Sequence, residues 1–175
     1  MSIDSFIRDP LGYSKTHIVQ FSHGSADVSP QAAAMTCIST MNNWAGNWTA
    51  EEYALIPGQF TGFEFVEGLQ AGTGARIRIG KGASKMHSVK CVPVNQDLGV
   101  RFLPWKPNCV TYMALDNNAT RFFTGPLSGC CIYIGDDANG VPYVFHANRN
   151  NSGGGNNLAI NTPHWTSPTV KPWCQ

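Results

Sequence analysis

The chain contains few charged residues, and its positive and negative charges almost cancel. Of its 175 residues, 13% are Asp, Glu, Lys or Arg, and the formal net charge at pH 7 is +1. Proteins that bind nucleic acid or an anionic membrane electrostatically need an excess of basic residues. We therefore expect neither nucleic acid nor a membrane as a partner.

Long hydrophobic runs are also missing. No stretch approaches the roughly 18 consecutive apolar residues that suggest a membrane-spanning helix. Residues 1–10 have neither the basic leader nor the apolar centre of a secretory signal. We expect a soluble protein without a cleavable signal peptide, and the sequence leaves its delivery route open.

The six cysteines do not form the CxxC pairs of a zinc site, and they are too sparse for a disulfide scaffold. His17, His23 and Asp27 are metal-ligand types close together, but no second ligand pair accompanies them, so we interpret them as solvated loop residues. We expect mostly reduced thiols, no metal and no organic cofactor.

The abundance of glycine and proline, 18 and 11 residues, favours many turns and short strands over a helical bundle. A helix is predicted from an N-cap at Ser29 to Trp44, and a second short helix from a capping box over residues 49–52. The fold class we predict is α+β, a mixed β-sandwich of two packed mixed sheets with peripheral helices, in a single catalytic domain over residues 1–175. Strands are predicted at residues 16–21, 63–66, 75–79, 88–94, 100–103, 110–115, 119–123, 130–134, 141–146 and 158–160.

The most informative stretch covers residues 122–148 and reads FFTGPLSGCCIYIGDDANGVPYVFHAN. It predicts two antiparallel strands joined by a five-residue turn over residues 136–140. If Gly135 faces Val141, counting back along both strands places Cys130 directly opposite His146. Directly opposed side chains share a face, so a thiol there reaches an imidazole.

This pairing suggests nucleophilic catalysis. An imidazole beside a cysteine takes its proton and raises its thiolate fraction, which makes Cys130 the candidate nucleophile and His146 its base. Cys131 points to the other face and is interpreted as a core residue. Ser128 and Gly129 form a turn in which backbone N–H groups can face a developing oxyanion. The alternative is that both cysteines and the histidine are ordinary interior residues.

These residues resemble a known family. FFT at residues 122–124, followed by LSGC at residues 127–130 and a histidine on the next strand, is similar to the catalytic core of Burkholderia lethal factor and, in part, to the cytotoxic necrotizing factor catalytic domain. LPWK at residues 103–106 resembles another segment of the Burkholderia toxin. The resemblance covers about a quarter of the chain. It implies a bacterial toxin, an effector and virulence factor with a deamidase-toxin-like fold.

By this resemblance the chain is a cysteine-dependent hydrolase, a protein glutamine deamidase. Cys130 attacks the side-chain amide, His146 transfers protons, and Thr124 orients the histidine, through its backbone carbonyl rather than its hydroxyl in our interpretation. The implied partner is a host protein carrying the target glutamine, such as a translation factor or small GTPase, reached in the host cytosol after synthesis in the bacterial cytoplasm. The alternatives are peptide cleavage or transglutamination by the same dyad, or a non-catalytic binding module.

Overall fold

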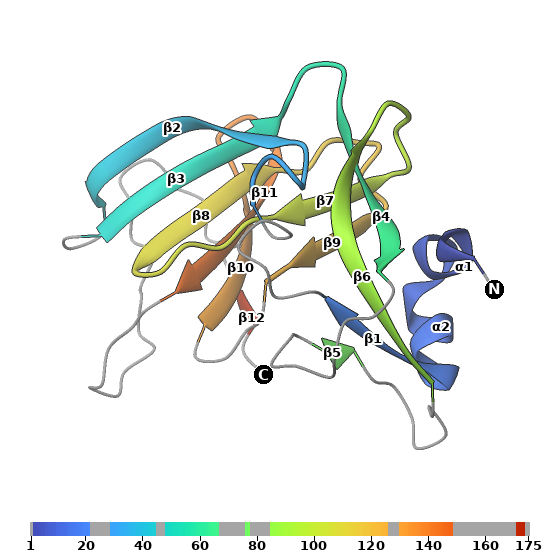
Figure 1. Ribbon diagram of the computed structural model, residues 1–175. Coiled ribbons are helices and arrows are strands. Elements are labelled where there is room, and N and C mark those ends of the chain that lie inside the picture. Colours follow the sequence, from blue (N-terminus) through green and yellow to red (C-terminus); the bar gives the residue numbers. More distant parts are fainter. Residues whose placement is uncertain are drawn as a thin grey trace.

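The computed structural model describes residues 2–21, 29–44, 48–66, 76–77, 85–125, 130–148 and 171–173. These residues form an α+β structure of mixed sheets with two short helices at one side (Figure 1). Its elements are α1 (Ile3–Arg8), α2 (Pro10–Thr16), β1 (His17–Phe21), β2 (Met35–Trp44), β3 (Trp48–Leu55), β4 (Phe60–Val66), β5 (Arg76–Ile77), β6 (Lys85–Val94), β7 (Val100–Leu103), β8 (Cys109–Ala114), β9 (Arg121–Thr124), β10 (Cys130–Asp136), β11 (Pro142–Asn148) and β12 (Lys171–Trp173).

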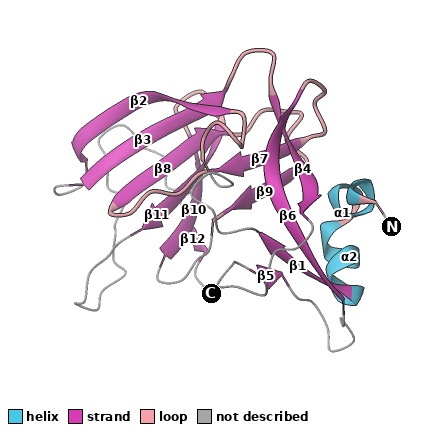
Figure 2. Ribbon diagram, in the orientation of Figure 1, coloured by secondary structure: helices cyan, strands magenta, loops and turns pink. Residues whose placement is uncertain are grey.

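The described strands form three sheets (Figure 2). A six-stranded sheet has the order β12-β10-β11-β8-β3-β2, and a four-stranded sheet has the order β4-β6-β1-β5. A parallel pair, β7 and β9, forms the third. Both larger sheets are mixed, because β3 pairs in parallel with β8 and β1 pairs in parallel with β6.

One hydrophobic core joins all three sheets and both helices. Phe6 of α1 is fully buried, and its ring contacts aromatic rings from α2, β1, β4 and β9 at centroid distances of 5.8–6.4 Å. The core also contains Ile132 and Val144 of the six-stranded sheet and Phe102 of β7. Burial of these large side chains is the main force that holds the sheets together.

A second apolar cluster lies on the opposite face of the six-stranded sheet. Because neighbouring strand residues point to opposite faces, Cys131 and Tyr133 belong to this cluster, whereas Ile132 belongs to the first. Phe145 of β11 is fully buried in it and stacks on Tyr112 of β8 at 5.3 Å. The sheet is therefore apolar on both sides around the β10–β11 hairpin.

The predicted helix from Ser29 to Trp44 is wrong beyond its first turn. The Ser29 hydroxyl does accept a hydrogen bond from the Ala32 N–H, as an N-cap should, but Ala34 has a φ of 54° and ends the turn. Met35–Trp44 then forms the edge strand β2, paired with β3 along its length. Threonine and isoleucine are β-branched and favour strands, and β2 contains Thr36, Ile38 and Thr40. The pairing with β3 outweighs the helical pattern of apolar residues spaced three and four apart.

The short helix predicted to begin at the capping box of residues 49–52 and to end before Pro57 is also wrong, because residues 48–55 form β3 between β2 and β8. Helices α1 and α2 and strand β12 were not predicted. The strands predicted over residues 16–21, 63–66, 88–94, 100–103, 110–115, 119–123, 130–134 and 141–146 are confirmed within a few residues at their ends. Of residues 75–79, the structure describes only β5, and residues 158–160 lie outside the described part.

Within the described ranges, no helix has the length and apolar character needed to cross a membrane.

Candidate active site

The β10–β11 hairpin pairs differently from the prediction. Cys130 faces Asn148, and His146 faces Ile132, so the register differs by two residues from the predicted Cys130–His146 pair. The loop begins one residue later than expected, because the Asp137 carboxylate accepts hydrogen bonds from the N–H groups of Asn139 and Val141. An aspartate that binds the backbone two residues ahead is a common turn former. The prediction of direct opposition is therefore wrong.

The shift by two residues keeps both side chains on the same face of the sheet. Cys130 and Ile132 alternate to one face, and His146 lies opposite Ile132 on that face. Cys130 and His146 are thus diagonal neighbours, and such pairs have Cα atoms about 7–8 Å apart. Cys131 points into the second apolar cluster, as its assignment to the core requires.

Thr124, at the end of β9, holds the histidine. Its Oγ1 donates a hydrogen bond to the Leu103 carbonyl at 2.9 Å and lies 2.6 Å from Nδ1 of His146. A threonine hydroxyl has one proton, and a carbonyl can only accept. The hydroxyl oxygen must therefore accept from Nδ1–H, which fixes the proton of the neutral ring on Nδ1 and the lone pair on Nε2. Thr124 contacts the ring as predicted, but through its hydroxyl instead of its carbonyl.

The imidazole of His146 is buried, and burial favours its neutral form. Its side chain has no solvent exposure, and burial lowers its pKa from 6.5 to about 4. Its Nε2 makes no hydrogen bond within the described residues. Because Cys130 is among those residues, the Cys–His hydrogen bond is not formed in this conformation.

Cys130 is half-buried, and its pKa is raised above its ordinary value by burial and, secondarily, by Cys131. This direction is opposite to the raised thiolate fraction predicted from an adjacent imidazole. The reason is geometric, because a diagonal neutral ring supplies no positive charge to a partly desolvated thiol. The resting dyad is therefore a thiol and a neutral imidazole, and not an ion pair.

Two motif segments that are distant in sequence meet at Thr124. Leu103 pairs with Thr124 across β7 and β9, and Trp105 packs on Gly125 so closely that a Cβ there would lie 2.0 Å from the indole Cδ1. Only glycine permits this approach. The LPWK and FFTG segments are thus one packing unit that positions the threonine. Ser128 and Gly129, the predicted oxyanion turn, lie outside the described residues.

The sequence analysis missed a polar cluster on the face of the six-stranded sheet that carries His146. Glu51 of β3 is buried, accepts a hydrogen bond from the Tyr53 hydroxyl at 2.8 Å and forms an ion pair with Lys106. Burial alone would raise the pKa of Glu51, but the hydrogen bonds from Lys106 and Tyr53 outweigh it and lower the pKa. The sequence analysis missed Glu51 because it assigned residues 49–52 to a helix, whereas they lie in β3.

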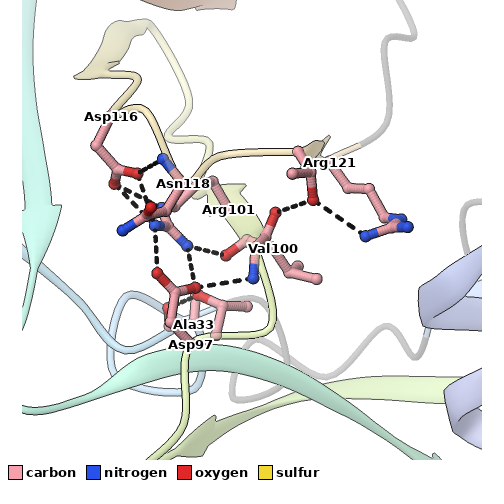
Figure 3. Close-up of polar contacts among 10 residues, drawn as sticks. Ala33, Asp97, Val100, Arg101, Asp116, Asn118 and Arg121 are labelled. Atoms are coloured by element: carbon pink, nitrogen blue, oxygen red, sulfur yellow. Dashed lines mark hydrogen bonds and ion pairs between the residues drawn. The ribbon is translucent and has the colours of Figure 1, made fainter.

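A buried arginine fixes β7, which carries the Leu103 carbonyl. The Arg101 side chain is 1% exposed and donates to both carboxylate oxygens of Asp97 and of Asp116 at 2.9–3.0 Å (Figure 3). We call these three residues the arginine network. An open depression of about 480 Å³ lies beside it. It is lined by Asp97, Leu98, Gly99, Asn117, Asn118 and Thr120.

No family model, curated protein or solved structure matches the chain.

The site must therefore be interpreted from its own chemistry. It offers a thiol, a neutral imidazole whose tautomer is fixed, and a hydroxyl that fixes it. In the part of the chain that is described, no group of three or more His, Cys, Asp or Glu residues is placed to hold a metal ion. What this arrangement can supply is nucleophilic attack by sulfur with proton transfer through Nε2.

Proposed function

We propose that the protein is a cysteine-dependent protein glutamine deamidase with a deamidase-toxin-like fold. The observation that carries the proposal is the hydrogen-bonded chain from the Leu103 carbonyl through Thr124 to Nδ1 of His146. A base that acts at Nε2 needs the other ring nitrogen held by an acceptor, and this chain supplies one. The lone pair on Nε2 has no hydrogen-bond partner within the described residues, which leaves it available to Cys130 or to a substrate group.

The proposed reaction starts from a neutral dyad. Nε2 of His146 takes the Cys130 proton as sulfur attacks the carboxamide carbon, which gives a tetrahedral oxyanion. The imidazolium then returns the proton to the departing ammonia, and a thioester remains. Water hydrolyses the thioester to glutamate. Because burial lowers the pKa of His146 and raises that of Cys130, proton transfer accompanies the attack and does not precede it.

Substrate binding has to bring the diagonal pair together. A rotation about χ1 moves the sulfur toward the imidazole without a change of register, and catalytic hydrogen bonds are often long before substrate binds. The proposed substrate is a surface glutamine of a host protein, and the proposed setting is the host cytosol after delivery from a bacterium. A translation factor or a small GTPase is the class of target that the motif resemblance suggests.

The experiment is a search for converted glutamines. The protein is incubated with host-cell lysate, and tryptic peptides are searched for Gln-to-Glu changes that require the protein. We expect the changes to disappear with Cys130→Ser and to persist with Cys131→Ser, the matched control one residue away. Conversion that survives Cys130→Ser would refute the assignment. New peptide termini or isopeptide links in place of conversion would assign the dyad to cleavage or transglutamination.

A non-catalytic binding module is the second candidate. The raised pKa of Cys130 favours it, because a thiol that stays protonated behaves as a small apolar side chain. On this alternative, no peptide changes covalently, while a target is retained equally by the wild type and by Cys130→Ser.

A further inference from the structure

Two buried polar atoms belong to directly paired residues of β8 and β11. Thr111 and His146 are directly paired in the antiparallel ladder, and both side chains have no solvent exposure. The Thr111 Oγ1 and the His146 Nε2 each lack a hydrogen-bond partner among the described residues, and they do not bond to each other. Directly opposed residues have Cβ atoms about 4.5–5.5 Å apart. The Thr111 and His146 side chains are therefore neighbours on one face of the sheet.

Neither atom can be left unsatisfied at low cost. A buried donor or acceptor without a partner has lost its hydrogen bonds to water without replacement, and here two such atoms belong to paired residues. The neighbouring carboxylate of Glu51, which faces Thr111 on β3, already accepts from Tyr53 and Lys106. A group that donates to Nε2 and also bonds to the hydroxyl satisfies both atoms, and water is the smallest group that does so.

We propose that one buried water bridges Thr111 and Nε2 of His146, and that Thr111 is a positioning residue for the hydrolytic step. The positioning role of Thr111 rests on the proposed function, whereas the bridging water does not. The tautomer fixes the direction of the hydrogen bond: Nε2 carries a lone pair, so it accepts a hydrogen bond from the water. The Thr111 hydroxyl then holds the water oxygen in place.

In the hydrolytic step, this water deacylates the enzyme. Its oxygen attacks the thioester carbon as one of its protons passes to Nε2, and a C–O bond forms. The tetrahedral intermediate collapses, the C–S bond breaks, and the sulfur takes the proton from the imidazolium. The products are a glutamate side chain and the Cys130 thiol, and no other reactant is needed.

The first measurement concerns the water itself. High-resolution crystal structures of the wild type, Thr111→Val and Thr111→Ser are compared, together with the ¹⁵N shift of Nε2 in histidine-labelled protein. We expect a water within hydrogen-bond distance of Nε2 and Oγ1 in the wild type and in the serine variant. In the valine variant, we expect the water to be lost or displaced and the Nε2 shift to move toward that of a ring without a donor. A dry Nε2 in the wild type would overturn the proposal.

The second measurement separates the two chemical steps. Ammonia release is followed in the first turnover and at steady state, with a peptide from a converted target as substrate. For Thr111→Val we expect an unchanged first-turnover burst, then deacylation slower by about 100-fold, since misplacement of a reacting group by an ångström costs that much. Thioester should accumulate, and Thr111→Ser should restore turnover.

Equal slowing of both steps would show a structural role and overturn the positioning role. If no form of the protein releases ammonia, the proposed function fails and the positioning role fails with it, while the bridging water is still decided by the crystal structures. The serine variant keeps the comparison valid if the valine variant does not fold.

Discussion

The buried neutral imidazole of His146 makes the stability of the protein depend on pH. Its pKa is about 4 when folded, against an ordinary value of 6.5. Between these values, the unfolded chain takes up a proton that the folded protein does not bind. The contribution of the neutral imidazole to the free energy of unfolding is therefore fully present above pH 6.5. It is lost progressively as the pH falls from 6.5 to 4, and it changes no further below pH 4.

The size of the effect follows from the pKa difference. One pKa unit corresponds to about 1.36 kcal/mol, so the fall from 6.5 to about 4 makes the free energy of unfolding smaller by about 3 kcal/mol. This is a large part of the 5–15 kcal/mol that typical domains possess. We therefore expect the urea midpoint to fall steeply between pH 6.5 and pH 4.

The assay is urea unfolding followed by tryptophan fluorescence at closely spaced pH values. His146→Asn is the main variant, because the asparagine amide can still donate to Thr124 but does not titrate. We expect its curve to be flatter than that of the wild type by most of the 3 kcal/mol. The control is His87→Asn, which removes a second histidine whose pKa is lowered by burial and by nearby His17 and Lys85. Parallel curves for the wild type and His146→Asn would refute the burial argument.

Three further predictions concern other parts of the site and fold. Thr124→Val should remove the acceptor for Nδ1, abolish activity and lower the free energy of unfolding by about 1–3 kcal/mol, whereas Thr124→Ser should retain both; full activity in the valine variant would contradict the role of the hydroxyl. In iodoacetamide mapping at pH 7, exposed Cys37 should be labelled before Cys130, whose labelling should increase well above pH 8 because its pKa is raised; the reverse order would show an activated thiolate. Asp97→Ala should cost about 3 kcal/mol in urea unfolding by removing one of the two carboxylates that bind the buried guanidinium, while Glu64→Ala, which breaks an exposed ion pair, should change stability by less than about 1 kcal/mol; equal effects would refute the burial argument.

The hairpin was predictable because its information is local. The residue pattern of segments 130–134 and 141–146 predicted both strands. Because side chains alternate between the two faces of a strand, Cys130 and His146 were placed on one face and Cys131 on the other. The register was not predictable at the same precision, since it depends on which aspartate closes the turn. Positions 136 and 137 are both aspartate, so the sequence does not show which of them closes the turn. In the folded loop, Asp137 accepts the N–H groups of Asn139 and Val141.

The errors around residues 29–52 have a different cause. The N-cap at Ser29 is real, but the chain beyond Ala34 gains more by pairing with β3 than by a helix of moderate propensity. Sequence reasoning weighed local signals only, and this pairing is a tertiary interaction. The same error hid Glu51, and with it the neighbourhood of Thr111. The contact between Thr124 and His146 was proposed from a motif resemblance, and local physics did not distinguish the hydroxyl from the carbonyl.

The hydrogen bond between Thr124 and His146 also joins two separately built sheets. Thr124 belongs to the β7–β9 pair, and His146 belongs to the six-stranded sheet. The position of the ring proton therefore reports whether the two sheets are docked. Substitutions far from the hairpin that loosen β7, for example in the arginine network, would let the imidazole exchange tautomers before the protein unfolds. The tautomer of His146, measured by NMR in the folded protein, therefore reports whether the two sheets are docked.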